Sequence, residues 1–243
     1  MSLSVRQKTV HGVSIGILML RTRFRRYPGD IGHAGTWPFP VAYRVVEEAT
    51  PAGIPGFGSP DMLAAFVRAG QELVAAGVDG IATSCGFLAM HQDALAAALG
   101  VPVASSALLQ VPVVQRLIGP ARRVGVLTYS AEALDRRHLE GAGAPADTPV
   151  AGLPPDGAFV RAIRDGGEVA LGVLRAEVLE TADRLLARHG DIGAIVCECT
   201  NLAPFSADIA ARHGLPVYDA VSLVTWFQAG LRPRRHPAED AAP

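Results

Sequence analysis

Short apolar runs alternate with longer alanine-rich segments along most of the chain. Strands are predicted at Val13–Leu20, Gly80–Thr83, Val101–Ala104, Arg123–Thr128, Ala194–Cys197 and Leu215–Tyr218. Helices are predicted at Pro60–Ala76, Leu88–Leu99, Ala107–Leu117, Ala131–Leu139, Glu168–Arg188, Phe205–His213 and Val221–Ala229. Strands that alternate with helices indicate the α/β class, and near-continuous apolar runs are typical of parallel strands covered on both faces.

The segment from Arg21 to Gly58 breaks this pattern. It is rich in glycine, proline and aromatic residues and shows no clear periodicity. A long loop that leaves the end of a strand in a compact α/β domain is often functional. We therefore expect this segment to cover the mouth of a ligand site.

The composition narrows the class of partner. The chain has 243 residues, 49% of them hydrophobic, and a formal net charge of −1. No apolar run approaches the roughly 18 residues of a membrane span, and no basic surplus favours nucleic acid. Three sparse cysteines and no export signal favour reduced thiols in the cytoplasm. A small-molecule substrate is expected, with neither a membrane nor a nucleic acid as partner.

An internal repeat is the most informative feature of the sequence. Shifting the chain by 114 positions places residues 79–109 on residues 193–223 without a gap, and ten of the 31 pairs are identical. The matched pairs include Cys85 with Cys199 and Gly100 with Gly214. A weaker similarity relates Ile15–Leu18 to Val124–Leu127. Each half thus begins with a glycine-containing strand and later carries a strand–cysteine–helix unit.

The repeat predicts two similar parallel-sheet α/β domains, related by a pseudo-twofold axis, with the active site in the cleft between them. The first domain is expected to comprise residues 1–119 plus 221–243 and to carry Cys85. The second, residues 120–220, carries Cys199.

The position of the two cysteines suggests their chemistry. Each follows a strand and precedes a helix, and parallel sheets bind ligands at the carboxyl ends of their strands. The amide groups at a helix start attract a carboxylate and favour thiolate over thiol. Two opposed thiols can remove a proton from one face of a carbon and return one to the other face, which is what racemisation requires.

With these motifs the chain resembles the aspartate/glutamate racemase superfamily, which includes hydantoin racemases. The resemblance rests on residues 83–87 (TSCGF), on Cys199-Thr200-Asn201, on the opening strand Ile15–Leu18, and on the segment from Gly29 through Thr36 and Phe39 to Tyr43. The chain departs from amino-acid racemases at Gly86 and Phe87, where that family usually carries Asn and Thr.

The resemblance implies a racemase or epimerase, an isomerase that acts next to a carboxylate without pyridoxal phosphate, another cofactor or a metal. It also implies a homodimer or higher homo-oligomer. Cys85 and Cys199 would be catalytic. The expected substrate-binding residues are Arg21, Ser84, Gly86, Phe87, Thr128, Tyr129, Thr200 and Asn201. Arg21, Thr128 and Tyr129 are chosen because they end or follow the first strand of each half.

Other polar residues are interpreted as structural. Cys197 pairs with Thr83 inside a strand, so we expect a packing role. Asp30 and His33 are assigned to a solvated loop face, and Arg23, Arg25 and Arg26 to surface charge.

Three alternative functions remain open from the sequence. A cis–trans isomerase of a maleate-like diacid also uses two cysteines. A decarboxylase of the same fold needs one, and a two-lobed binding protein needs none.

Overall fold

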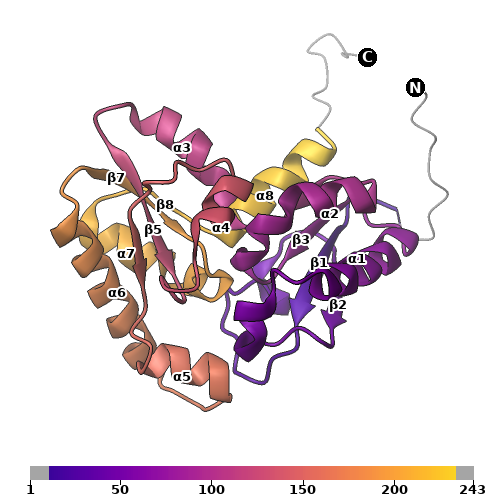
Figure 1. The fold of residues 1–243 in the computed structure, drawn as a ribbon, viewed down its shortest axis with the longest axis horizontal. Helices are drawn as coiled ribbons and strands as arrows, with labels where there is room; N and C mark the ends of the chain where they lie inside the picture. The colour runs from indigo at the N-terminus through magenta and orange to yellow at the C-terminus, as the bar shows by residue number, and fades with distance from the viewer. Residues whose placement is uncertain (1–10, 234–243) are drawn as a thin grey trace, which may run out of the picture.

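The computed structural model describes residues 11–233 and contains two four-stranded parallel sheets, one in each lobe (Figure 1). The first sheet has the order β2-β1-β3-β4, and the second has the order β6-β5-β7-β8. The first-sheet strands, in chain order, are β1 (Ile15–Leu20), β2 (Val41–Val46), β3 (Gly80–Thr83) and β4 (Val103–Ala104). Those of the second are β5 (Arg123–Thr128), β6 (Val150–Gly152), β7 (Ile192–Cys197) and β8 (Val217–Tyr218).

The identical strand order confirms the predicted α/β architecture of two similar sheets. In both sheets the first strand of the half lies between its neighbours and pairs with the strand that precedes the repeat-related cysteine, β1 with β3 and β5 with β7. Every residue of β1 and β3 is buried. These strands have no solvent face, which explains why they read as continuous apolar runs.

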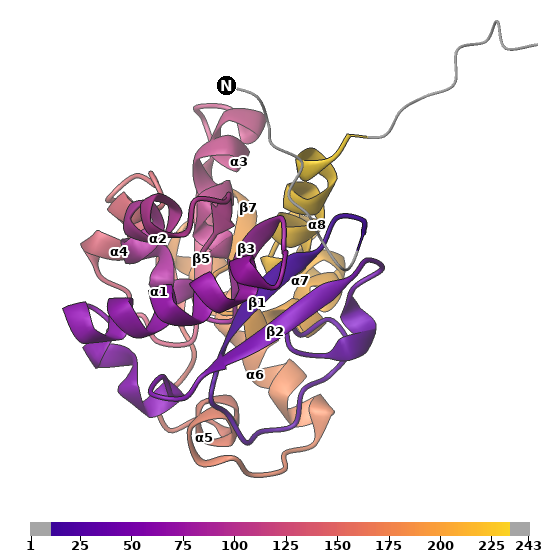
Figure 2. The ribbon, with the colours of Figure 1, turned by 90° about the vertical axis from the view of Figure 1, so that its right-hand side faces the viewer.

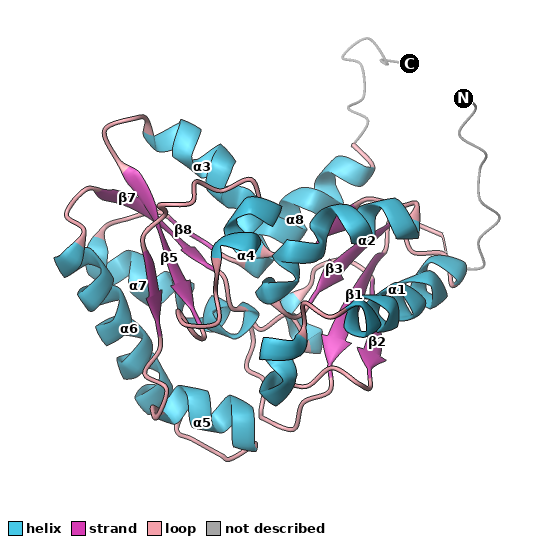
Figure 3. Ribbon diagram, viewed as in Figure 1, coloured by secondary structure: helices cyan, strands magenta, loops and turns pink. Residues whose placement is uncertain are grey.

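Helices cover the sheets on the outside of each lobe (Figure 3). The first lobe has α1 (Pro60–Ala75) and α2 (Gln92–Leu99). The second has α5 (Ala158–Asp165), α6 (Leu171–Arg188) and α7 (Ser206–His213). Helix α4 (Arg136–Gly141) packs instead against the turn after Cys85, where a Cβ added at Gly141 would collide with the Ala89 carbonyl oxygen. The start of α1 follows the sequence prediction, because the Ser59 hydroxyl accepts a hydrogen bond from the Met62 amide (3.3 Å) and Pro60 opens the helix.

Two further helices pack against the sheet of the opposite half. Helix α3 (Val111–Ile118) follows β4, yet its Val111 and Val114 belong to a buried cluster with Val124 and Val196 of the second sheet. Helix α8 (Ala220–Leu231) follows β8, and its Val224 is buried with Ile15 and Ile17 of the first sheet. Figures 1 and 2 place α3 and α8 at the same end of the molecule, opposite α5. Each half thus contributes one helix to the core of the other half, and this packing holds the two lobes together.

Two strands and one α-helix were not predicted. Strand β2 lies inside the segment interpreted as a loop, β6 has only three residues, and α5 was overlooked. Strand β2 is an edge strand whose residues Val41 to Val45 are partly or fully exposed, so it lacks the apolar run that marks the other strands. Helix α4 also begins at Arg136, five residues later than predicted, where the Asp135 side chain caps it.

No helix within residues 11–233 is both long and apolar enough to span a membrane. Residues 1–10 and 234–243, both assigned to the predicted first domain, lie outside the described residues.

Candidate active site

The two repeat-related cysteines end their strands in the same way and line one cavity. Each caps a short 3₁₀ helix, Gly86–His91 after Cys85 and Thr200–Phe205 after Cys199. The two turns touch, because Thr200 Oγ1 donates a hydrogen bond to the Ser84 carbonyl oxygen (2.9 Å). The cavity between the lobes is therefore bounded by the carboxyl ends of both sheets, where parallel sheets place their ligands.

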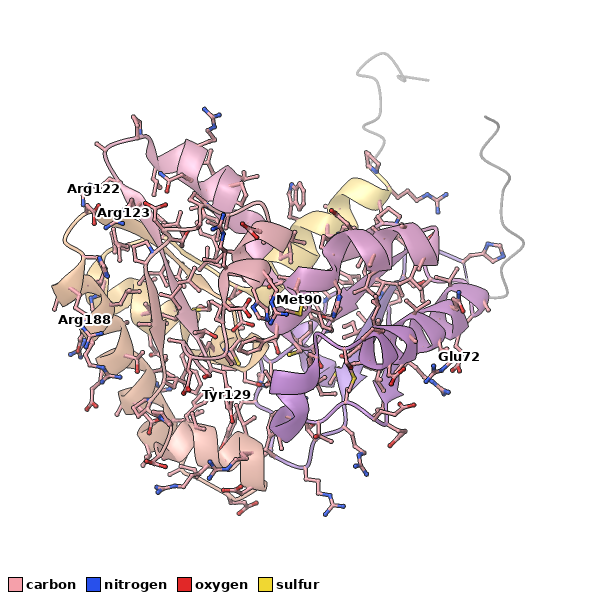
Figure 4. All side chains as sticks on the ribbon, in the orientation of Figure 1. Glu72, Met90, Arg122, Arg123, Tyr129 and Arg188 are labelled. Atoms are coloured by element: carbon pink, nitrogen blue, oxygen red, sulfur yellow. The ribbon has the colours of Figure 1, made fainter. Side chains whose placement is uncertain are left out.

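Eight of the ten predicted site residues line this cavity: Ser84, Cys85, Gly86, Phe87, Tyr129, Cys199, Thr200 and Asn201. Tyr129 lies at the junction of the two lobes (Figure 4). The other two, Arg21 and Thr128, are not among the lining residues. The Arg21 side chain is 55% exposed and lies 4.0 Å from Glu47, while Thr128 is buried behind the cavity wall.

The surroundings of the thiols do not favour thiolate, contrary to the prediction. Burial raises the pKa of Cys85, and the nearby Glu198 carboxyl raises it further. The same two causes, in the same order, raise the pKa of Cys199 well above its usual value. The backbone amides of Phe87 and Asn201 offset only part of this effect on the pKa. Burial and the neighbouring carboxyl therefore both favour the protonated thiol at Cys85 and at Cys199.

Glu198 is a buried cavity residue that the sequence analysis did not select. Its side chain is fully buried, it lines the cavity, and its Oε2 accepts a hydrogen bond from Thr128 Oγ1 (2.6 Å). Oε1 has no hydrogen-bond partner among the described residues. Burial raises the pKa of Glu198 to about 7. Hydrogen bonds from the Thr128 hydroxyl and the Tyr129 amide lower this pKa and so oppose part of the effect of burial. The repeat offered a signal, since it aligns this acid with Ser84 at the end of a buried strand.

Glu198 packs so closely against position 86 that only glycine fits there. A Cβ added at position 86 would collide with Glu198 Oε1 and would lie 2.5 Å from the Glu198 carbonyl oxygen. This explains the departure from the Asn found in amino-acid racemases. The carboxyl of the second unit occupies the space that a side chain of the first unit would need.

A polar chain connects Cys199 to the segment after β1. Cys199 Sγ donates to Asn201 Oδ1 (3.6 Å), and Asn201 Nδ2 donates to Asp30 Oδ2. Asp30 also accepts from Arg26, whose Nη2 donates to Thr22 Oγ1 (3.1 Å). Asp30 is only 2% exposed and the Arg26 side chain 13%. The interpretations of Asp30 as a solvated residue and of Arg26 as surface charge were therefore wrong.

The segment from Arg21 to Gly58 forms one wall of the cavity. Thr22, Phe24 and Arg26 line it near β1, and Pro51 and Ile54 line it after β2. The chain turns against the second lobe at Gly29, where φ is +95° and an added Cβ would lie 3.2 Å from Pro204 Cα. The segment thus bridges both lobes beside the thiols, as a cover for the site would.

Cys197 is part of the core. It is fully buried in a cluster with Leu127, Ile195 and Leu202. The repeat-related Thr83 fills the same position and donates its hydroxyl to the Ser105 carbonyl oxygen (2.6 Å). Within the described part of the chain, no group of three or more His, Cys, Asp or Glu side chains is arranged to hold a metal ion.

Sequence comparison places the chain beside a named group of enzymes, although no family model matches it. It is 30% identical over 225 residues to dimethylsulfoniopropionate lyase from Durusdinium sp. clade D, covering 90% of this chain and 75% of that protein. It is also 30% identical over 234 residues to dimethylsulfoniopropionate lyase 7 from Emiliania huxleyi (strain CCMP1516), covering 90% of this chain and 67% of that protein.

Solved structures share the fold at lower sequence identity. An arylmalonate decarboxylase superposes with a TM-score of 0.60 at 17% identity and covers 90% of this chain and 96% of its own. Allantoin racemase from Pseudomonas fluorescens superposes with a TM-score of 0.56 at 17% identity, with 90% of each chain covered. Glutamate racemase from Francisella tularensis gives a TM-score of 0.53 at 15% identity and covers 93% of this chain and 85% of its own.

Proposed function

Because the chain belongs to the family of the dimethylsulfoniopropionate lyases, within the aspartate/glutamate racemase superfamily, we propose that it cleaves dimethylsulfoniopropionate by removing a proton next to the carboxylate. The observation that carries this proposal is that two buried thiols, Cys85 and Cys199, line one cavity. A thiol there meets the substrate carbon away from bulk water, where proton transfer to a positioned side chain is effective.

The reaction is a β-elimination that needs one base. The substrate is a propionate whose third carbon carries a dimethylsulfonium group. A thiolate takes a proton from the second carbon, the electron pair forms the double bond to the third carbon, and the bond from that carbon to sulfur breaks. Dimethyl sulfide leaves as a neutral molecule and acrylate remains. The sulfide needs no proton to leave, so a second acid is not required.

The cavity offers partners for both ends of such a substrate. Arg26 and Asn201 line the cavity and carry more N–H groups than their bonds to Asp30 and Thr22 use, which suits a carboxylate. Phe24, Phe87 and Tyr129 supply aromatic faces, which attract methylated cations. This combination fits a molecule with a carboxylate at one end and a sulfonium at the other.

Racemisation is the second candidate, and the two repeat-related cysteines favour it. If each thiol serves one face of the substrate carbon, the enzyme is the isomerase that the sequence suggests. The named relatives, by contrast, are lyases. The two functions differ in whether a carbon–sulfur bond breaks, and one set of measurements separates them.

The test is incubation of the purified protein with dimethylsulfoniopropionate, with dimethyl sulfide measured by headspace gas chromatography and acrylate by NMR. Parallel reactions in deuterated water contain each enantiomer of aspartate, glutamate and allantoin. We expect sulfide and acrylate in equal amounts, and loss of both in Cys85→Ser. Cys197→Thr is the matched control and retains activity, because Thr83 fills the equivalent position. Deuterium exchange into an amino acid or allantoin, with no sulfide released, would replace the lyase by a racemase.

A further inference from the structure

Glu198 is a buried acid that the elimination as described above does not use. It lines the cavity, and its Oε1 is shielded from solvent and has no hydrogen-bond partner among the described residues. The other oxygen, Oε2, accepts a hydrogen bond from the Thr128 hydroxyl (2.6 Å), which fixes the orientation of the carboxyl. A buried carboxylate is costly to maintain unless a positive group pairs with it. The free oxygen therefore points to a ligand that supplies the missing charge.

No cation of the protein supplies this charge within the described part of the chain. Arg26 is the one cationic residue that lines the cavity, and it forms its salt bridge with Asp30. The pKa of Glu198 is shifted by burial and by two neutral donors, the Thr128 hydroxyl and the Tyr129 amide. The cavity thus contains one carboxyl without a counter-charge, at the end of β7, and one cation, on the segment after β1.

Two aromatic residues line the cavity next to this carboxyl. Gly86 lies against Glu198 Oε1, and Phe87 follows it in the turn. Tyr129 donates its backbone amide to the carboxyl, and its side chain borders the same cavity. The Phe87 ring is held by an edge-on contact with His138, with 5.3 Å between the ring centroids. Aromatic faces beside a carboxylate suit a methylated cation, which carries positive charge but has no N–H or O–H to donate.

We propose that the Glu198 carboxylate binds the dimethylsulfonium group of the substrate, with Phe87 and Tyr129 against its methyl groups. The inference rests on the proposed function and names the residue that selects a cationic leaving group. Arg26 and Asn201 bind the carboxylate of the same molecule, so the substrate lies between a cationic and an anionic group of the protein. A neutral molecule of the same shape lacks the charge that Glu198 recognises.

Binding of the cation also changes the surroundings of the thiols. In the free site the Glu198 carboxyl raises the pKa of both Cys85 and Cys199. A sulfonium beside the carboxylate offsets this charge, so the bound substrate favours the thiolate that the free site disfavours. Cys199 Sγ already donates to Asn201 Oδ1 (3.6 Å), whereas no side-chain hydrogen bond engages the Cys85 thiol in the described part of the chain, so we assign the base to Cys85.

The protons balance in this scheme. The thiol proton of Cys85 passes to solvent, and the resulting thiolate takes the proton from the second carbon of the substrate and becomes a thiol again. The sulfonium leaves as neutral dimethyl sulfide, so each turnover releases dimethyl sulfide, acrylate and one proton. Acrylate then remains beside the Glu198 carboxylate without a cation between them, and repulsion between the two anions favours its release.

The experiment compares two ligands that have the same shape and differ by one charge. One probe is β-alanine betaine, a propionate whose third carbon carries a trimethylammonium group in place of the sulfonium. The other is its neutral isostere, in which a tert-butyl group replaces the trimethylammonium. Isothermal titration calorimetry with the full-length protein gives both dissociation constants at pH 8, above the Glu198 pKa of about 7. We expect the wild type to bind the cationic probe about tenfold or more tightly than the neutral one, and Glu198→Gln to abolish this preference.

Two results would overturn the proposal. A preference for the cation that persists in Glu198→Gln would assign the binding of the cation to the aromatic faces alone. An equal loss of affinity for both probes would mean that Glu198 only shapes the cavity. Glu177→Gln, at a carboxyl that accepts a hydrogen bond from the Ala158 amide at the start of α5 (2.7 Å), is the matched control and should change neither dissociation constant.

A second variant covers the case in which Glu198→Gln does not fold. Thr128→Val removes the hydrogen bond that holds the carboxyl and lowers the pKa of Glu198, so a smaller fraction of the carboxyl is charged at pH 7. Its preference for the cationic probe at that pH should fall below that of the wild type, and an equal preference would contradict the proposal. Because these measurements involve no turnover, their failure leaves cleavage of dimethylsulfoniopropionate standing. Failure to cleave that compound leaves the measured preference intact.

Discussion

The strand–cysteine units of the two lobes have nearly the same backbone and different side chains. The Ser84 amide donates to the Leu18 carbonyl oxygen and the Glu198 amide to that of Leu127, each at 2.8 Å. The amides of Leu88 and Leu202 close the two turns on Cys85 and Cys199, at 3.1 and 3.0 Å. The peptide chain thus presents two thiols in matching positions.

The side chains beside the thiols break this symmetry. The Ser84 hydroxyl accepts a hydrogen bond from the Leu20 amide and so is engaged within its own lobe (2.9 Å). Glu198, its counterpart, points its free oxygen at the opposite turn. A duplicated fold can therefore place two like groups symmetrically while the neighbouring residues give them different surroundings. This inequality of surroundings suits a one-directional elimination, which needs one base, better than a racemisation.

Loss of the cysteines should test this inequality most strongly. Cys85→Ser should lower turnover of dimethylsulfoniopropionate by about 10³-fold, because a positioned base contributes roughly 10² to 10⁴ and a hydroxyl is a far weaker acid than a thiol. Cys199→Ser should cost about tenfold, because serine remains a hydrogen-bond donor. The measurement is kcat from sulfide release. Equal losses of kcat in Cys85→Ser and Cys199→Ser would show that the two thiols contribute equally to turnover and would contradict the expected difference.

The stability of the protein should depend on the Glu198 carboxyl between about pH 4.5 and 7. The folded-state pKa is raised from 4.5 to about 7, so within this window the folded protein holds a proton that the unfolded chain has released. The stabilisation is fully present below pH 4.5 and is lost as the pH rises through 7. The free energy of unfolding of the wild type should thus fall by about 3 kcal/mol across the window, relative to Glu198→Gln.

Urea denaturation at several pH values measures this difference. If the free energy of unfolding depends on pH in the same way for the wild type and Glu198→Gln, the pKa of Glu198 is not raised in the folded protein. The carboxyl beside Gly86 would then be charged throughout this pH window.

Closing the space between the two units should be the next largest effect. Gly86→Ala places a methyl group against the Glu198 carboxyl and should destabilise the protein by about 1–3 kcal/mol, as overpacking does. Thermal unfolding measures the change. Gly172→Ala is the control, since an added Cβ there meets nothing within 4 Å and the residue lies in α6, where alanine is favoured. Equal melting temperatures for Gly86→Ala and the wild type would show that the carboxyl is not held where the turn needs glycine.

The smallest effect is expected at Cys197. Cys197→Thr should change kcat less than about twofold and stability by about 1 kcal/mol or less, because the first lobe carries Thr83 in the equivalent place. Sulfide release and urea denaturation measure both. A large loss of turnover with intact folding would move the active thiol from Cys199 to Cys197 and invalidate the repeat alignment at this point.

Much of the site could be predicted because the signals are local. A buried strand, the cysteine after it and the glycine that ends the next helix lie within one short stretch, and the stretch occurs twice. Strand β2 escaped prediction because an edge strand need not be apolar, and Arg26 and Asp30 were misjudged because a charged loop residue gives no sign of its partner.

The sequence by itself determined the α/β class, the two similar halves and the choice of Cys85 and Cys199, since periodicity and duplication are properties of contiguous residues. Tertiary structure alone decided the environment of those thiols. Glu198 meets Gly86 112 positions away in the chain, and Asn201 meets Asp30 across 171. Such contacts arise only when two lobes close on one cavity, and burial in that cavity, rather than residue type, sets the proton affinity of each group.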